Sequence, residues 1–222
     1  MPMPPPSPEI DPIDAAPMSA SLRDLARQGE LKRLRKGATL IVEGEPGDTL
    51  YSVLTGKLRA FSATDDGRGV IYGYYSAGAC VGEMGLDGGP RSASVDAAEP
   101  TLCVRIPRYL IEKQLREDPG FAMELIKLVI RRARTATEAL QRLALTDVWG
   151  RLKPELESRM VKQPDGTWLI DKAPPHRELG RLLSCAPASI TKALGPLQVG
   201  GYIELKDRGR RIVILKPLPK RL

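Results

Sequence analysis

The sequence has no long hydrophobic run. Nowhere do about eighteen apolar residues follow one another, the length that a membrane-spanning helix needs. The first residues lack the basic-then-apolar order of a secretory signal. Cysteine is scarce, and Cys80, Cys103 and Cys185 lie far apart, which is typical of reduced thiols and not of a disulfide framework or a metal cluster. We therefore predict a cytoplasmic protein with no membrane contact.

Histidine is almost absent, and this limits the enzyme classes. His176 is the only one in the sequence and lies far from the other polar motifs, so no pairing of a nucleophile with a base is visible. A nucleotide hydrolase is the enzyme to weigh, because residues 55–58 (TGKL) resemble part of a phosphate-binding loop. That loop needs a glycine where the sequence has Tyr51 and a Ser or Thr where it has Leu58. The sequence therefore predicts a protein that is not an enzyme.

Positive charge is concentrated in the last third of the chain. Residues 148–222 contain 15 Lys and Arg against 7 Asp and Glu, a net charge of +8, whereas residues 1–147 contain 19 against 20, a net charge of −1. With 222 residues the chain is long enough for two compact units. A separate basic unit indicates a polyanionic partner, although scattered surface lysines on an ordinary domain would give the same count.

The first half of the chain predicts an arm followed by a β domain. Residues 1–20 contain seven prolines and little that could pack, which predicts a disordered arm or a loosely attached leader. Residues 21–34 have the spacing of a short amphipathic helix. Seven short β-like runs then follow between residues 38 and 106, separated by turns such as 55–56 and 65–69. This pattern predicts an all-β sandwich or jelly roll.

After Pro107 the apolar residues recur with helical spacing. Steps of four and three form an unbroken a/d series of three heptads at Ala122, Ile126, Val129, Ala133, Ala136, Leu140 and Leu143. Such a seam predicts a parallel coiled-coil homodimer. The alternative is a helix that lies on its own domain, and Leu125 and Leu128 beside the seam indicate that the helix does this as well.

The C-terminal third has the layout of a winged helix-turn-helix. Helical stretches are expected at 148–160, 175–183 and 187–199, with a short turn at 184–186 and a helix end at Gly200 and Gly201. Two β-like runs, beginning at Tyr202 and Arg211, flank a basic turn. A helix, a tight turn, a second helix and a β-wing together predict DNA binding.

One loop combines chemistry for phosphate and for sugar. Residues 82–94 read GEMGLDGGPRSAS, and their Gly and Pro residues allow a tight path that turns several backbone N–H groups toward one point. Arg91 supplies a bidentate fork for a phosphate, whereas Glu83 only accepts hydrogen bonds, which suits a hydroxyl. The loop therefore predicts a nucleotide-binding site.

Four motifs together resemble the CRP/FNR (cAMP receptor protein) family of bacterial transcription regulators. They lie at 42–61 (VEGEPGDTLYSVLTGKLRAF), 82–94, 143–151 (LALTDVWGR) and in the helix-turn-helix that ends in GGYIEL. The resemblance implies an α+β fold with an N-terminal cyclic-nucleotide-binding β jelly roll, a long dimerisation helix and a C-terminal winged helix-turn-helix. The expected domains are a disordered arm at 1–20, the β-roll at 21–117, the coiled-coil helix and hinge at 118–147 and the DNA-binding domain at 148–222.

The family implies roles for the residues of the loop. Glu83 would accept from the ribose hydroxyl, and Arg91 would pair with the cyclic phosphate, supported by Ser92 and by backbone N–H groups near Gly82 and Met84. The competing explanation is a buried structural ion pair between Arg91 and Glu83 that needs no ligand.

The base of the nucleotide is less strongly specified. The family reads adenine with a basic residue and two adjacent hydroxyl residues of the central helix, and the matching positions here are Arg132, Ala136 and Thr137, so one hydroxyl is missing. Tyr72 replaces an aliphatic residue of the cAMP-binding relatives. We expect cAMP as the effector, with no other cofactor. Cyclic GMP, cyclic di-GMP and a ligand-independent regulator with a vestigial pocket are the alternatives.

The resemblance also implies how DNA would be read. The recognition helix would begin near Pro187, and by position Pro187, Ala188 and Lys192 stand where relatives carry Arg, Glu and Arg. We expect Ser189, Thr191 and Lys192 to be the base readers, on an operator unlike the familiar CRP consensus. The residues expected at phosphates are Arg177, Arg208, Arg210, Arg211 and Lys172. A homodimer would need an inverted-repeat operator, and the family implies contact with RNA polymerase.

Overall fold

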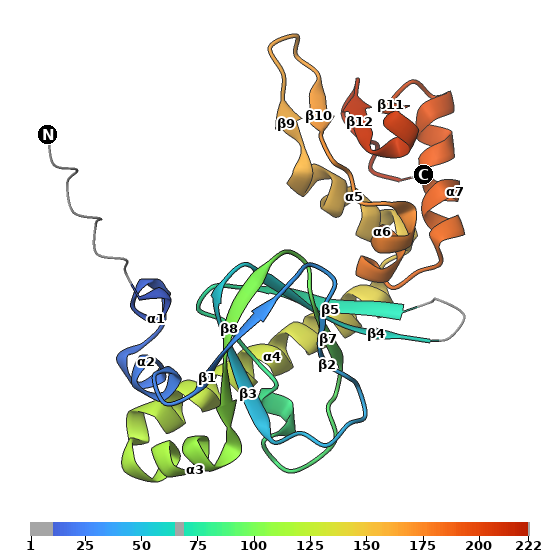
Figure 1. The fold of residues 1–222 in the computed structure, drawn as a ribbon. Helices are drawn as coiled ribbons and strands as arrows, with labels where there is room; N and C mark the ends of the chain where they lie inside the picture. Colours follow the sequence, from blue (N-terminus) through green and yellow to red (C-terminus); the bar gives the residue numbers. More distant parts are fainter. Residues whose placement is uncertain (1–10, 65–68, 222) are drawn as a thin grey trace, which may run out of the picture. The chain divides into compact units, whose positions relative to one another are not determined.

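The computed structural model describes residues 11–64 and 69–221, and the chain divides into two compact units (Figure 1). One unit contains the residues up to Ser62 together with Tyr72–Ala133. The other contains Ala63–Ile71 and the residues from Arg134 onward. The 65–69 turn expected from the sequence lies outside the described residues except for Gly69.

Two four-stranded antiparallel sheets form most of the first unit. One has the order β1-β8-β3-β6 and the other β2-β7-β4-β5. The strands are β1 (Glu30–Leu34), β2 (Thr39–Ile41), β3 (Thr49–Thr55), β4 (Lys57–Ala63), β5 (Gly69–Ser76), β6 (Cys80–Val81), β7 (Ser94–Ala97) and β8 (Thr101–Pro107). All seven β-like runs that the sequence predicted between residues 38 and 106 are strands, which confirms the β-roll.

Side-chain patterns explain the places of these strands. β3 is buried on both faces from Thr49 to Leu54, and it pairs with β8 in a register that sets Leu50 opposite Ile106. β4 alternates, with Leu58 and Ala60 buried and the residues between them half exposed. Gly56, with φ 83°, makes the turn between β3 and β4. Because a strand and not a helix follows residues 55–58, this segment is no phosphate-binding loop.

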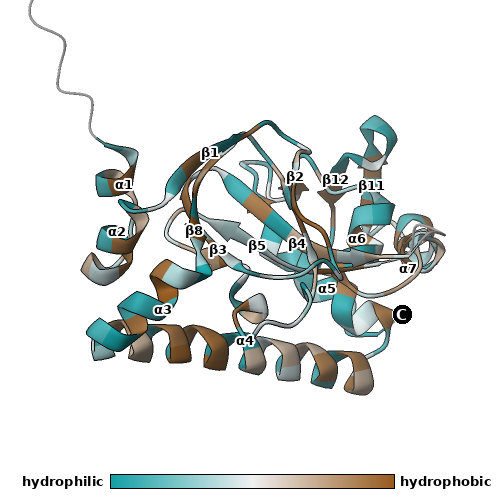
Figure 2. Ribbon diagram, turned by 60° about the horizontal axis from the view of Figure 1, so that its bottom comes forward, coloured by the Kyte–Doolittle hydropathy of each residue, from teal (hydrophilic) through white to brown (hydrophobic). Residues whose placement is uncertain are grey.

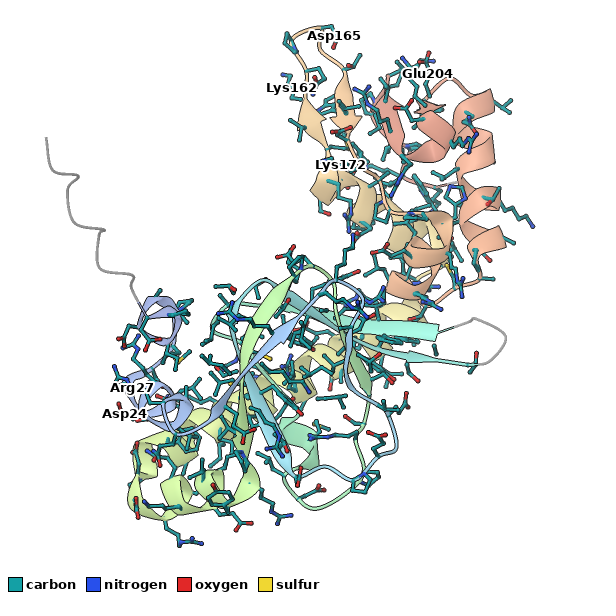
Figure 3. The ribbon with its side chains drawn as sticks, viewed as in Figure 1. Asp24, Arg27, Lys162, Asp165, Lys172 and Glu204 are labelled. Carbon is teal, nitrogen blue, oxygen red and sulfur yellow. The ribbon has the colours of Figure 1, made fainter. Side chains whose placement is uncertain are left out.

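The N-terminal segment is more ordered than the sequence predicted. The disordered arm expected at 1–20 is wrong for residues 11–20, where α1 (Pro12–Ala15) and the start of α2 (Ala20–Ala26) are helical. Asp11 and Ser19 cap these helices, and Ile13 and Ala16 are buried in the β-roll core. Residues 1–10 lie outside the described residues. Figure 3 labels Asp24 and Arg27, which form an ion pair on α2.

The helix expected over residues 21–34 ends earlier than predicted. α2 stops at Ala26, and residues 30–34 form β1, which pairs with β8. The close approach of Gly29 explains the change, because a Cβ there would lie 2.6 Å from the Arg105 carbonyl oxygen. The apolar spacing of Leu31 and Leu34 therefore belongs to a strand.

Two helices follow the roll. α3 (Arg108–Glu117) packs Leu110 and Ile111 into the core, and Asp118 ends it and accepts from the N–H groups of Gly120 and Phe121 at the start of α4 (Pro119–Leu145). Hydrophobic residues recur along α4 (Figure 2). Leu128 packs against the core, as predicted.

The second unit has the winged helix-turn-helix layout that the sequence predicted. α5 (Val148–Arg159) begins at the Asp147 cap, and α6 (His176–Leu182) and α7 (Pro187–Val199) are joined by the turn at 184–186. Gly180 is required there, because a Cβ would lie 2.7 Å from the Cys185 carbonyl oxygen. β11 (Ile203–Lys206) and β12 (Arg211–Ile214) form the wing.

A further hairpin in this unit was not predicted. β9 (Val161–Lys162) and β10 (Trp168–Ile170) extend the wing into a sheet of order β11-β12-β10-β9. Asp165 lies at the tip of this hairpin, and Lys172 follows β10 (Figure 3). The core beneath contains Trp149, Leu156 and Ile190.

Candidate functional site

The loop at 82–94 faces a second loop at 44–49, and we call residues 82–91 with 44–49 the cup. Gly82 has φ 92° and leads into a single 3-10 turn, η1 (Glu83–Gly85). The two loops are joined by the backbone, because Arg91 donates to the Glu45 carbonyl at 2.8 Å and accepts from the Gly44 N–H at 2.9 Å. Glycines on both sides permit this approach, since a Cβ on Gly47 would lie 2.9 Å from the Gly85 Cα.

Arg91 lies in the cup and forms no ion pair with a described residue. The residue is 8% exposed, and its Nη1 donates to the carbonyl oxygens of Thr49 (2.9 Å) and Gly82 (3.0 Å). Within the described chain, Nε and Nη2 of Arg91 make no hydrogen bond, and no carboxylate lies at ion-pair distance. Both nitrogens remain partly accessible, because neither is a fully buried atom without a partner. The guanidinium is thus fixed by one nitrogen, and the other two can bind an anion.

Glu83 is paired with the long helix. Its side chain is 6% exposed, and Oε1 accepts from Arg132 Nε of α4 at 3.0 Å. Arg132 also donates from Nη2 to the Cys80 carbonyl at 2.8 Å. The structural Arg91–Glu83 ion pair that the sequence left open is therefore not what is observed, because Arg91 binds carbonyls and Glu83 binds Arg132. Glu83 keeps Oε2 as a second acceptor.

Tyr75 of β5 completes the cluster, and the sequence analysis missed it. The Arg132 guanidinium lies over its ring, 4.1 Å from the centroid. Burial raises the pKa of the Tyr75 phenol above its usual value. The ring lies near Gly73, where a Cβ would be 3.1 Å from the Tyr75 hydroxyl. Gly73, two residues before Tyr75 on β5, was the sequence feature that could have indicated room for this ring.

Tyr72, the aromatic residue predicted for this site, has a different environment. It is 50% exposed and shares the exposed pattern of Tyr74, whereas Ile71 and Tyr75 are more buried. Among the described residues, the hydrogen bonds, ion pairs and ring contacts of Glu83, Arg91 and Arg132 do not include Tyr72. The structure therefore brings Tyr75 to the cluster in place of Tyr72, because alternate residues of a strand point to opposite faces.

The other predicted ligand residues are exposed. Met84 and Ser92 are exposed at the two ends of the loop. Ala136 and Thr137 are exposed on α4 about one turn beyond Arg132. Of the predicted set, Gly82, Glu83, Arg91 and Arg132 are joined by direct contacts to the cup or to one another.

In the second unit, α7 is the helix expected to read DNA, and its exposed residues are both polar and apolar. Pro187 is its first residue, as predicted, and the exposed residues near its start are Pro187, Ala188, Thr191 and Lys192, whereas Ser189 is half-buried. Among the expected phosphate contacts Arg177, Arg208, Arg210 and Lys172 are exposed. Arg211 is shared with two acids, because its Nε lies 3.3 Å from Asp171 Oδ1 and 3.9 Å from Asp207 Oδ2.

The described residues show neither a metal-ligand cluster nor a helix that could span a membrane. No three His, Cys, Asp or Glu side chains between residues 11 and 64 or 69 and 221 gather as metal ligands. No helix there is both long and apolar enough to cross a bilayer.

The glycine at the entrance of the cup gives a first testable prediction. We expect Gly82→Ala to destabilise the protein by about 1–2 kcal/mol more than Gly44→Ala, because both positions have positive φ but only Gly82 is crowded. A Cβ on Gly82 would lie 2.7 Å from the Thr49 carbonyl oxygen and 2.9 Å from Arg91 Nη1, while nothing lies within 4 Å of one on Gly44. Urea unfolding measures both, and equal losses would contradict the crowding.

Comparisons with known proteins place the cup within a domain of known type. Residues 31–118 match the family described as cyclic nucleotide-binding domain. The chain is 26% identical over 193 residues to the CRP-like cAMP-activated global transcriptional regulator of Mycobacterium tuberculosis, covering 85% of this chain and 86% of that one. It is 28% identical over 182 residues to the cAMP-activated global transcriptional regulator CRP of Salmonella typhimurium, covering 80% and 85%.

A solved structure agrees in fold. The c-di-GMP responsive global regulator CLP of Xanthomonas campestris superimposes with a TM-score of 0.71 at 23% identity, covering 89% of this chain and 99% of that one. The shared fold with CLP concerns the architecture alone. Residues 31–118 thus match the cyclic nucleotide-binding domain family, and over four fifths of its length or more the chain is similar to CRP-like transcriptional regulators.

Proposed function

We propose that the protein is a dimeric transcription regulator whose affinity for DNA is set by a cyclic nucleotide in the cup, with cAMP as the first candidate. The observation that supports this most is Arg91, a mostly buried cation with two nitrogens left for an anion. A cyclic phosphate carries one negative charge and two exocyclic oxygens, which suits a guanidinium fork. Glu83 Oε2 would accept the ribose hydroxyl beside it.

The contact between Glu83 and Arg132 suggests how binding reaches the helix. Arg132 belongs to α4 and is held by Glu83, by the Cys80 carbonyl and by the Tyr75 ring. A nucleotide that hydrogen-bonds to Glu83 would weaken or strengthen these contacts of Arg132. It would therefore change the free-energy difference between two alternative placements of α4. A ligand acts on an equilibrium only through such differential contacts.

The seam of α4 supports a homodimer. Its members Ile126, Val129, Leu140 and Leu143 are large apolar residues that remain exposed in the single chain. A contiguous apolar stripe of this kind is typical of an interface, and the seam of three heptads suits a second copy in parallel. A twofold dimer would present two α7 helices to successive major grooves, about 34 Å apart, and so require an inverted repeat.

Cyclic di-GMP and cyclic GMP are the second candidates for the effector. Ala136 offers no hydroxyl where the family reads adenine, and Tyr75 places an aromatic ring on Arg132. The structural neighbour CLP is described as c-di-GMP responsive. RNA polymerase is proposed as a partner on the family resemblance alone.

Calorimetry and DNA binding test the proposal. The full chain is titrated with cAMP, cGMP and cyclic di-GMP, and its affinity for duplexes selected from a random library is measured with and without each. We expect one nucleotide to bind and to change DNA affinity by about 5- to 150-fold, the usual range of allosteric coupling. The affinity should also fall steeply with salt. DNA affinity unchanged by saturating amounts of all three would contradict control by these nucleotides.

A further inference from the structure

We infer that His176 is a positioning residue that holds the Thr191 hydroxyl as a hydrogen-bond acceptor, so that the recognition helix selects adenine or cytosine at the base it faces. This inference rests on the proposed DNA binding and adds a chemical rule for one base position. It concerns the only histidine of the chain and an exposed threonine of α7.

The two residues are in direct contact between the helices of the helix-turn-helix. His176 is the first residue of α6, and its Nδ1 lies 2.9 Å from Thr191 Oγ1 on α7. Thr191 Oγ1 also donates to the carbonyl oxygen of Pro187, four residues earlier, at 3.3 Å. These two contacts select one side-chain rotamer, since a helical threonine otherwise divides between two.

The Thr191 hydroxyl has one hydrogen-bonding position left for a base. A threonine hydroxyl has one proton and two acceptor positions. The carbonyl of Pro187 can only accept, so the proton points at it and His176 Nδ1–H donates to Oγ1. If the proton turned to Nδ1 instead, it would still point into the protein. In both arrangements Thr191 offers outward only a lone pair.

The position of Thr191 directs this lone pair away from the domain. Ile190 and Leu194, which flank Thr191 on α7, are buried, whereas Thr191 and Lys192 are exposed at the edge of this buried face. In the major groove adenine and cytosine display amino donors, while guanine O6 and thymine O4 are acceptors. An acceptor-only hydroxyl therefore favours adenine or cytosine and opposes the other two bases.

A purely structural contact would behave differently. If His176 only fastened α6 to α7, its loss would lower the stability and weaken binding to every duplex equally. If it contacted a phosphate, its loss would weaken binding uniformly and reduce the salt dependence. A positioning role changes the preference among bases at one position.

The test uses the full chain and duplexes selected from a random library, in separate selections with cAMP, cGMP, cyclic di-GMP and no nucleotide. We expect adenine or cytosine at one position of each half-site. Thr191→Val removes the lone pairs at nearly constant shape and should reduce that preference by about three- to tenfold, the value of one hydrogen bond. His176→Ala should relax it in the same direction because the hydroxyl can then turn.

Conservative variants separate positioning from folding. In His176→Asn the amide nitrogen takes the place of Nδ1, and in Thr191→Ser the hydroxyl remains, so both should keep the preference. Gln198→Ala, at the exposed far end of α7, is the matched control and should change nothing at that position. Urea unfolding of each variant checks the fold.

The outcomes separate the two proposals. Selection of guanine or thymine at the position that responds to Thr191→Val, or an unchanged profile in Thr191→Val and His176→Ala, would overturn the inference while DNA binding stands. Failure of the unmodified protein to select any duplex under all four conditions would overturn the proposed function, and the inference with it.

Discussion

Replacing Arg91 by alanine is expected to weaken binding of the effector by on the order of a hundredfold or more. The variant removes a mostly buried guanidinium that has no acidic partner in the described chain and offers two nitrogens to an anion. A hydrogen bond to a charged group contributes about 1.5–3 kcal/mol, so losing a bidentate pair costs more than two factors of ten. The phosphate would also be left in the cup without a counter-charge.

The same substitution has a smaller effect on folding. Arg91 donates to the Thr49 and Gly82 carbonyls, and removal of these bonds should cost about 1–3 kcal/mol, which a typical domain tolerates. Arg91→Lys keeps the charge but loses the fork, and we expect intermediate affinity. Arg108→Ala removes an arginine whose guanidinium comes near Gly88 and whose exposed pair with Glu112 contributes little, so binding should be unchanged.

Isothermal titration calorimetry with the three cyclic nucleotides, beside urea unfolding, measures both quantities. If Arg91→Ala and Arg108→Ala both retained the nucleotide affinity of the unmodified protein, the Arg91 guanidinium would only stabilise the loop. The cup would then not be a phosphate site.

The sequence specified the fold well where the cues are local. Alternation in residues 57–63, the turn at Gly56 and the a/d steps of the long helix depend only on neighbours along the chain. The glycines of the 82–94 loop likewise indicated a tight path, and Gly82 and Gly88 both have positive φ. The sequence singled out Glu83 and Arg91 as candidate ligand residues because glycines and a proline surround them.

The missed features depend on long-range contacts or on very short elements. Arg132 reaches Glu83 across 49 residues of sequence, and Tyr75 joins them only because of the side on which β5 places it. Within residues 11–20, α1 packs Ile13 into a core that the local composition does not reveal. β9 has two residues, too few for a period, although Pro164-Asp165-Gly166 is a turn signal that could have predicted the hairpin.

A charged residue in the a/d seam of α4 should strongly weaken dimerisation. Leu140 is 67% exposed in the single chain and Ile126 is 51% exposed, yet both belong to the a/d series. In a parallel dimer Leu140→Glu would remove two buried leucines at once and bring two carboxylates together. Burial of each leucine contributes about 1.5–3 kcal/mol, so the dimerisation constant should fall by a factor of roughly 10² to 10⁴.

Loss of the dimer should also remove most of the DNA affinity, because a monomer engages one half-site and forfeits the second, linked contact. Sedimentation equilibrium and anisotropy with a selected duplex measure the two effects on the same samples. Leu31→Glu is the matched control, since Leu31 is a comparably exposed leucine on β1 and outside the seam, at 55%. A Leu140→Glu protein that remained dimeric would place the interface elsewhere, and the exposed stripe of α4 would then need a different partner. If Leu140→Glu became monomeric while Leu31→Glu remained dimeric, α4 would be the dimer interface. The distance between the two α7 helices would then depend on the pairing of α4.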